Sequence, residues 1–351
     1  MCGPDGSPPS REYRTLPHLR PSGASSEAQG ARAGDLVIET VPLAHNGYTY
    51  KYSKIVYIKG RPPAPVILVH PNYAGLKQFD IDVAAFLARS GYVGFALDIY
   101  KEEGDYKYFD RNPDQGTTPE LIAKARKHFY GAFRAMNKHL RNPKEWRDIM
   151  KKYLDTAGHH PAVATGKAAA IGYCFGGQCL LEQVRAGHPL QAVVSFHGLL
   201  NSRPTHQDDL LGRKKGRLTK EQFERECGTV ENCYSTNCKV LIENGDLDDH
   251  VKEADVLEFK TEFDAQGIDW RINNHAQTHH GFALSEGVWS HKYDEDADRR
   301  STLAMLSLFA EVWPEHKQYY VGANACGTKL GQAIVPAQVP PHGQAMVSAR
   351  L

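Results

Sequence analysis

The sequence lacks the features that would direct it to a membrane or to nucleic acid. It has no apolar run approaching the roughly 18 residues that a membrane-spanning helix requires. Its 42 basic and 41 acidic residues leave a net charge of only +1. A chain without a charge excess has no general attraction to a nucleic-acid backbone or an anionic lipid surface. We therefore expect neither nucleic acid nor membrane among its partners.

Paired cysteines and a secretion signal are also missing. The sequence contains seven cysteines, an odd number without any Cys-x-x-Cys pair, which favours free thiols in a reducing compartment. The N-terminus shows no apolar segment after its first charges, so secretion is not expected. These absences predict a cytoplasmic protein with no metal site and no cofactor. An alternative address is peroxisomal, because the C-terminal Ala349-Arg350-Leu351 resembles a Ser-Lys-Leu signal.

The strongest pattern is an alternation of buried-type strands and amphipathic helices. Residues 65–70 and 92–97 read as strands, and residues 76–90 between them have helical spacing that ends at Gly91. Short strand–helix–strand connections are typical of a parallel sheet. Further elements are expected along the chain: helices at 119–140, 143–156, 175–186, 251–266 and 297–312, and strands at 167–171, 191–196, 239–243 and 268–273.

The ends and one insertion depart from this alternation. Residues 36–41 and 48–58 read as two strands joined through Asn46-Gly47, which predicts an antiparallel pair at the sheet's edge. We expect one α/β domain over 35–321, a disordered tail at 1–34 and an irregular tail at 322–351. Residues 201–237 are too long for a plain connection and predict a lid-like insertion. Thr219-x-x-Gln222 indicates a short helix within that insertion.

The apolar strand at 167–171 runs into Gly172-Tyr173-Cys174-Phe175-Gly176-Gly177. This is a nucleophile elbow, in which one reactive residue sits in a tight turn between a strand and a helix. Glycines two residues either side of Cys174 avoid the collisions that a Cβ would make there. The turn also places the sulfur at a helix N-terminus, which favours the thiolate.

An acid and a histidine follow later strands, in the order expected for an α/β-hydrolase. The strand at 239–243 leads to three acid candidates, and the strand at 268–273 leads to three histidine candidates. The acids are Asp246, Asp248 and Asp249, and the histidines are His275, His279 and His280. Each group comes just beyond the carboxyl end of a predicted strand, where α/β sheets carry their functional residues.

These motifs resemble the dienelactone hydrolase family over residues 64–312. The resemblance rests on Gly-Tyr-Cys-Phe-Gly-Gly, on Gly245-x-x-Asp248-x-x-Val251 and on His280-Gly281-Phe282-Ala283. It implies an α/β-hydrolase fold, with a mostly parallel sheet flanked by helices. It also implies an enzyme that cleaves esters and enol lactones. It further implies Cys174 as nucleophile, Asp248 as acid and His280 as base. His275 and His279 are then expected to be solvated or to lie beside the site.

The oxyanion hole is expected to use two backbone N–H groups. One belongs to Phe175, the residue after the nucleophile, and the resemblance assigns the other to Tyr73. Two positions differ from the family's pattern. Asn72 stands where founding members have a glutamate that helps to form the thiolate, and Leu284 stands where they have an arginine for the substrate carboxylate.

Asn72, Tyr100 and Leu284 are the expected substrate-binding residues. Tyr100, together with Tyr106, Tyr108 and Phe109, could equally cover the edge of the sheet. The departure at Leu284 predicts a preference for neutral, apolar esters or lactones over acidic dienelactones. The predicted partner is thus a small-molecule ester or lactone, cleaved through a thioester on Cys174. A thioesterase or acyltransferase with the same triad and a non-catalytic ligand-binding protein are the alternatives.

Overall fold

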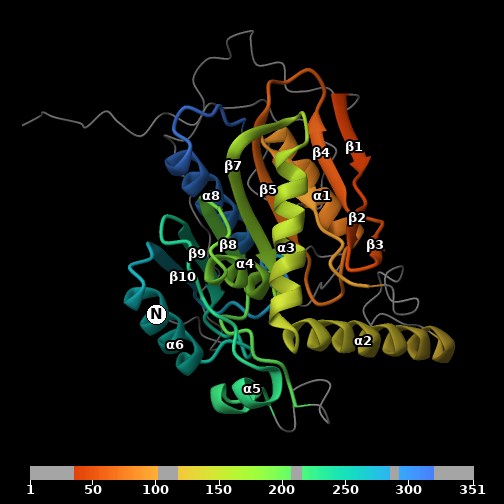
Figure 1. Ribbon diagram of the computed structural model, residues 1–351, viewed down its shortest axis with the longest axis vertical. Helices are drawn as coiled ribbons and strands as arrows, with labels where there is room; N and C mark the ends of the chain where they lie inside the picture. The colour runs from red at the N-terminus through yellow and green to blue at the C-terminus, as the bar shows by residue number, and fades with distance from the viewer. Residues whose placement is uncertain (1–34, 102–117, 207–215, 285–291, 320–351) are drawn as a thin grey trace, which may run out of the picture.

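The structure is a computed structural model that describes residues 35–101, 118–206, 216–284 and 292–319. The two predicted tails, at 1–34 and 322–351, and the residues Tyr106, Tyr108 and Phe109 lie outside the described residues. Within them the expected α/β-hydrolase architecture is confirmed: helices cover both faces of a mostly parallel sheet (Figure 1).

The described residues form an eight-stranded sheet in the order β1-β4-β6-β5-β7-β8-β9-β10. All pairs from β6 to β10 are parallel, whereas β1 and β4 run antiparallel at one edge. The strands are β1 (Leu36–Thr40), β4 (Lys54–Ile58), β5 (Ala64–His70), β6 (Val93–Ala96), β7 (Val163–Tyr173), β8 (Ala192–Phe196), β9 (Lys239–Gly245) and β10 (Trp270–His275). The central strands are continuous apolar runs because both faces of a parallel sheet are buried.

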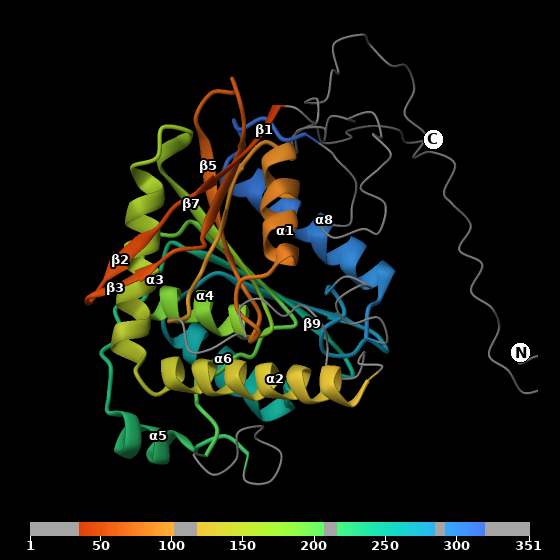
Figure 2. The same ribbon diagram turned by 90° about the vertical axis from the view of Figure 1, so that its right-hand side faces the viewer.

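Helices cover the sheet on its two faces. They are α1 (Gln78–Arg89), α2 (Pro119–Leu140), α3 (Pro143–Gly158), α4 (Phe175–Arg185), α5 (Lys220–Cys227), α6 (Glu253–Ala265) and α8 (Glu295–Val312). Side chains alternate along a strand, so Leu68 of β5 joins the core shared with α3, α4 and α6, whereas Ile67 joins the core shared with α1 and α8. Figure 2 shows the two groups of helices on opposite sides of the sheet, with α2 lying across its lower end.

The N-terminal strands correct one expectation. Asn46-Gly47 does form a tight turn, with φ of 46° and 72°, but it joins β2 (Leu43–His45) and β3 (Tyr48–Tyr50) in a separate two-stranded sheet. The extended strand is then interrupted at residues 51–53. There the hydroxyl of buried Ser53 accepts a hydrogen bond from the Asp98 N–H and donates one to the Tyr153 hydroxyl. Residues 54–58 therefore form a new strand, β4, which supplies the antiparallel partner of β1.

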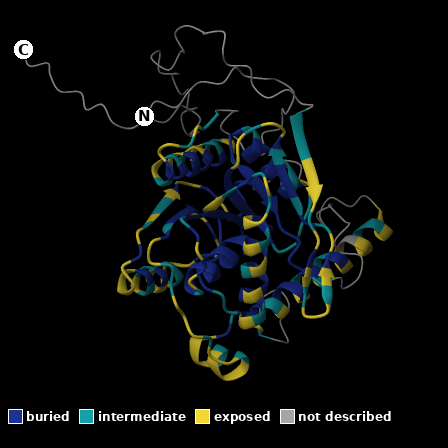
Figure 3. Cartoon of the chain, turned by 45° about the horizontal axis from the view of Figure 1, so that its top comes forward, coloured by how far each residue is buried: buried dark blue, intermediate teal, exposed yellow. Residues whose placement is uncertain are grey.

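The predicted insertion at 201–237 is described over 201–206 and 216–237. It contains α5, whose capping box joins Thr219 and Gln222 as the sequence indicated. None of the residues of α5 is buried, and Figure 3 shows this helix exposed at the margin of the dark-blue core. Its role as a lid stays a prediction.

Buried ion pairs fix the two ends of that insertion on the domain. Glu182 of α4 lies between Arg147 of α3, at 2.7 Å, and Arg185, at 3.0 Å. Arg185 also donates to the carbonyl of Leu200, and Arg147 donates to the carbonyl of Glu231. The charges are therefore satisfied inside the protein, and the same cations hold the chain where the insertion leaves and rejoins it.

Candidate active site

Cys174 sits alone between β7 and α4, in a backbone conformation that non-glycine residues rarely adopt. Its φ is 55° and its ψ is −111°, a strained geometry of the kind that gathers at functional sites. A Cβ on Gly172 would lie 2.3 Å from the carbonyl oxygen of Gly176, and a Cβ on Gly176 would lie 2.4 Å from that of His70. The elbow can therefore be this tight only with glycine on both sides.

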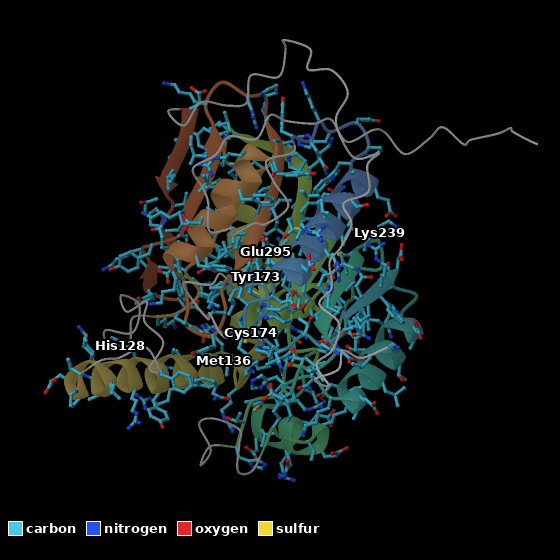
Figure 4. The ribbon with its side chains drawn as sticks, turned by 180° about the vertical axis from the view of Figure 1, so that it is seen from behind. His128, Met136, Tyr173, Cys174, Lys239 and Glu295 are labelled. Atoms are coloured by element: carbon cyan, nitrogen blue, oxygen red, sulfur yellow. The ribbon has the colours of Figure 1, made fainter. Side chains whose placement is uncertain are left out.

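Cys174 lies at the start of a helix and is nearly buried. The residue is the N-cap of α4, and it is 8% exposed. The first N–H groups of a helix lack intrahelical acceptors, so the backbone beside the sulfur carries hydrogen-bond donors. In Figure 4 Cys174 appears at the level of α2, beside the end where Met136 lies, while His128 is farther out along the helix.

Asp248 is the acid that meets a histidine. It follows β9 and is buried, whereas Asp246 and Asp249 are exposed. Its Oδ1 accepts the His250 N–H at 2.8 Å, and its Oδ2 lies 2.9 Å from Nδ1 of His280. Burial alone would raise the pKa of Asp248, but the hydrogen bond and charge of His280 hold that pKa below its usual range.

His280 lies within interaction range of both Asp248 and Cys174. It is 3% exposed, its Nδ1 hydrogen-bonds the Asp248 carboxylate, and the Cys174 side chain is close enough to affect its charge. Burial opposes its protonation, yet the charge on Cys174 and the bond to Asp248 together raise the pKa of His280 to about 10. The raised pKa favours a protonated His280 ring beside the Asp248 carboxylate near pH 7.

The other two histidine candidates take different positions. His279 is exposed, as expected of a solvated neighbour. His275 is buried at the end of β10, and its Nε2 lies 2.7 Å from the Glu243 carboxylate on β9. It thus forms a second acid–histidine pair beside the first, and it contacts neither Cys174 nor Asp248 in the hydrogen bonds of the described residues.

The turn after β5 contains Asn72 and Tyr73. The side-chain oxygen of Asn72 accepts the Ala74 N–H at 2.8 Å, and its backbone carbonyl accepts the Gly75 N–H at 3.0 Å. Asn72 therefore organises this turn internally. The assignment of Tyr73 and Phe175 as oxyanion donors stays a prediction, as does a contact between Asn72 and substrate.

Tyr100 and Leu284 are both buried. Tyr100 is 1% exposed, and its hydroxyl donates to the Tyr73 carbonyl at 3.1 Å. Leu284 is also 1% exposed and packs with Phe282 and Ala283 in the core on the side of α1 and α8. Their predicted contacts with substrate are not tested by this arrangement.

Three residues near the site were not singled out from the sequence. The rings of His197 and His250 lie 5.2 Å and 4.5 Å from that of His280. Burial lowers the pKa of Arg217, and the nearby charge of Cys174 partly offsets this effect. His197 could have been found, because it follows β8 at the same edge of the sheet as Cys174. Arg217 belongs to the insertion, where no periodic pattern indicates position.

The described residues contain no group of three or more His, Cys, Asp or Glu side chains arranged to hold an ion. Among the same residues, none of the helices combines the length and apolarity that a membrane crossing requires. The chemistry that the arrangement does provide is nucleophilic, with a thiol, a histidine and an acid connected in series.

The chain is similar in sequence to proteins of one family. Residues 53–313 match the sequence profile of the dienelactone hydrolase family. The carboxymethylenebutenolidase of Pseudomonas sp. (strain P51) is 24% identical over 194 residues, which cover 55% of this chain and 71% of the enzyme. The uncharacterized Caenorhabditis elegans protein K02A2.1 is 27% identical over 158 residues, or 44% of this chain and 85% of that protein.

Solved structures give the same picture. The dienelactone hydrolase-like promiscuous phosphotriesterase P91, from metagenomic libraries, is 25% identical and superimposes with a TM-score of 0.56. The match covers 80% of this chain and 99% of P91.

Proposed function

The chain belongs to the dienelactone hydrolase family, and on this premise we propose that it hydrolyses carboxylic esters or lactones through Cys174, His280 and Asp248. The observation that carries the proposal is the position of His280, which hydrogen-bonds the Asp248 carboxylate and interacts with the Cys174 side chain. Such a series of nucleophile, base and orienting acid is the arrangement that acyl transfer requires.

The reaction proceeds in two stages. His280 takes the proton of Cys174, and the thiolate attacks the carbonyl carbon of the substrate. The N–H groups of Phe175 and Tyr73 stabilise the oxyanion, and His280 returns its proton to the departing alkoxide, which leaves an acyl thioester on Cys174. His280 then takes a proton from water, and the hydroxide attacks the thioester carbonyl. The C–S bond breaks, the acid is released, and His280 returns the proton to the sulfur, which restores the thiol.

Replacement of the nucleophile tests this proposal directly. Cys174→Ala should lower kcat for an aryl ester or enol lactone by about 10³-fold or more, because no covalent step remains. The matched control is Cys233→Ala, which removes an exposed thiol and should leave turnover unchanged. Turnover by Cys174→Ala at the wild-type rate would refute the proposed function.

The alternatives are separated by substrate and by reactivity. A thioesterase would prefer acyl thioesters to oxygen esters in kcat/KM, and an acyltransferase would form a new ester when an alcohol is supplied. The non-catalytic alternative rests on Asn72, which stands in place of the family's glutamate. Because Asn72 organises the turn after β5, its presence has a structural reason that does not depend on loss of activity.

A further inference from the structure

We propose that Tyr100 is a positioning residue that holds the two expected oxyanion-hole amides in their places. The inference rests on the proposed function and adds a residue through which that function is controlled. Tyr100 lies in the loop after β6, far in sequence from Cys174. It contacts the residues that carry both amides: its ring packs on Phe175, and its hydroxyl binds the backbone of Tyr73.

The first contact belongs to a stack of four nearly parallel rings under the elbow. The ring centroids of His139 and Tyr100 lie 5.3 Å apart, with 24° between the ring planes. The ring centroids of Tyr100 and Phe175 lie 6.1 Å apart with an interplanar angle of 18°, and those of Phe175 and Trp146 lie 5.4 Å apart with an angle of 12°. Phe175 is thus held between rings from the loop after β6 and from α3, which fixes the start of α4 where its N–H group is expected to act.

The second contact fixes the turn that carries the other amide. The Tyr100 hydroxyl donates to the carbonyl of Tyr73 at 3.1 Å. On the same peptide group, the Ala74 N–H donates to the side chain of Asn72 at 2.8 Å. Both polar ends of the peptide between Tyr73 and Ala74 are therefore held. The Tyr73 N–H is the next polar group back along the chain, so its direction depends on this peptide.

Helix α2 holds both partners of this hydrogen bond. His139 of α2 binds the carbonyl of Ile99, the residue before Tyr100, through Nε2 at 2.7 Å. Burial lowers the pKa of His139 to about 4, so the ring is neutral near pH 7, and Nε2 must carry the hydrogen because a carbonyl only accepts. Phe133 of the same helix packs on the Tyr73 ring at 4.7 Å.

Loss of the Tyr100 hydroxyl should weaken binding of the transition state without weakening binding of the substrate. Oxyanion donors act because they are already directed to where charge develops. A small displacement of such a group can cost up to about 10²-fold in rate. Tyr100→Phe keeps the ring and its stack but removes the hydroxyl that holds Tyr73. We expect kcat for an aryl ester to fall about 10-fold or more, with KM within about twofold of wild type.

A matched variant separates positioning from general loosening. Tyr153 is also buried, and its hydroxyl donates to the Asp98 carbonyl at 2.6 Å, two residues before Tyr100. Tyr153→Phe removes this hydrogen bond and the one that Ser53 donates to the same hydroxyl, without touching Tyr73. We expect it to lower the melting temperature at least as much as Tyr100→Phe does, while its kcat stays within about twofold of wild type.

A second readout uses the thiol itself. Alkylation of Cys174 by iodoacetamide needs the thiolate but forms no oxyanion, so its rate as a function of pH should be the same in Tyr100→Phe and wild type. A fall in kcat confined to Tyr100→Phe, with unchanged alkylation, supports the proposal. Wild-type kcat in Tyr100→Phe, equal losses in both tyrosine variants, or a parallel fall in alkylation would each overturn it.

The same measurements keep the two proposals apart. If Cys174→Ala is inactive while Tyr100→Phe turns over at the wild-type rate, the proposed hydrolase function stands and the role of Tyr100 is wrong. If Cys174→Ala retains activity, the proposed function itself has failed.

Discussion

Cys174 combines a strained backbone with a favourable electrostatic position. A non-glycine residue in a sparsely populated region costs roughly 1–3 kcal/mol, and the φ of 55° at Cys174 is of that kind. The surrounding structure must supply this energy, because any relaxation of the turn would move the sulfur away from His280. Strain at the nucleophile is therefore part of what keeps the thiol, the histidine and the acid in contact.

The charge state of His280 should depend on the sulfur. Burial lowers the pKa of His280, whereas Cys174 and Asp248 raise it to about 10. Replacing Cys174 by alanine removes the larger of the two raising contributions, so the pKa of His280 should fall toward or below its ordinary value of about 6.5. An NMR titration of the His280 ring in wild type and Cys174→Ala measures this shift.

A stability consequence follows with a definite sign. Because the pKa of His280 is raised in the folded state, its contribution to the free energy of unfolding is complete below about pH 6.5 and is lost as the pH rises toward 10.

The NMR titration also has an outcome that would contradict the prediction. If His280 keeps its wild-type pKa in Cys174→Ala, Cys174 carries no charge at this position.

The sequence was sufficient to identify the candidate triad but not its support. Cys174, Asp248 and His280 each follow a predicted strand, so their meeting at one edge of the sheet follows from topology alone. The bond from Tyr100 to the Tyr73 carbonyl joins residues 27 positions apart and depends on side-chain direction. No periodicity encodes it, and the same holds for the ring of His197 against His280.

At the scale of the element, the elbow depends on close approach between a helix and two strands. A Cβ on Gly176 would meet the His70 carbonyl at 2.4 Å and that of Pro71 at 3.0 Å. Backbone atoms cannot yield as a flexible side chain can. Gly176→Ala should therefore lower the free energy of unfolding by about 3 kcal/mol or more, at the severe end of single substitutions. Urea unfolding followed by circular dichroism measures the change.

Gly158 supplies the control for that experiment. It ends α3, and a Cβ there would meet nothing within 4 Å. Gly158→Ala should leave stability unchanged or raise it by up to about 1 kcal/mol, because alanine loses less conformational entropy in a helix. Equal effects of the two substitutions would mean that close packing does not define the elbow.

Most helices and strands lie where the sequence pattern predicts them, because local signals in the sequence specify a single secondary structure there. Residues 119–140 and 143–158 each begin after a capping side chain, Thr118 and Asn142, with proline in the first turn. The N-terminal strands differ from their predicted bounds, because Asn46-Gly47 specifies a turn but not the length of the hairpin that it closes. Where β3 ends is decided by Ser53, through contacts with Tyr153 and Asp98 more than 40 positions away.

At the scale of the whole molecule, the net charge is close to zero, and cations near the site are likewise paired with carboxylates. Of the basic residues that could approach a substrate, Lys101 is paired with Glu145 at 2.9 Å, and Arg203 binds the Glu258 carboxylate through both terminal nitrogens. These cations are therefore already compensated within the protein. They differ from Arg217, whose charge interacts with Cys174 itself.

Substrate selectivity should follow from this distribution of charge. Leu284 brings no cation to the site, and Arg217 donates Nη1 to the Arg203 carbonyl at 2.7 Å while facing the charge of Cys174. Among the described residues a substrate carboxylate would be desolvated without a dedicated partner, which costs several kcal/mol. The methyl ester of a dienelactone should thus exceed the free acid in kcat/KM by about tenfold or more. Arg217→Gln should widen this difference, because it removes a cation that could attract the acid. A free acid preferred tenfold by wild type, with the preference lost in Arg217→Gln, would instead assign the carboxylate to Arg217 and refute the prediction made from Leu284.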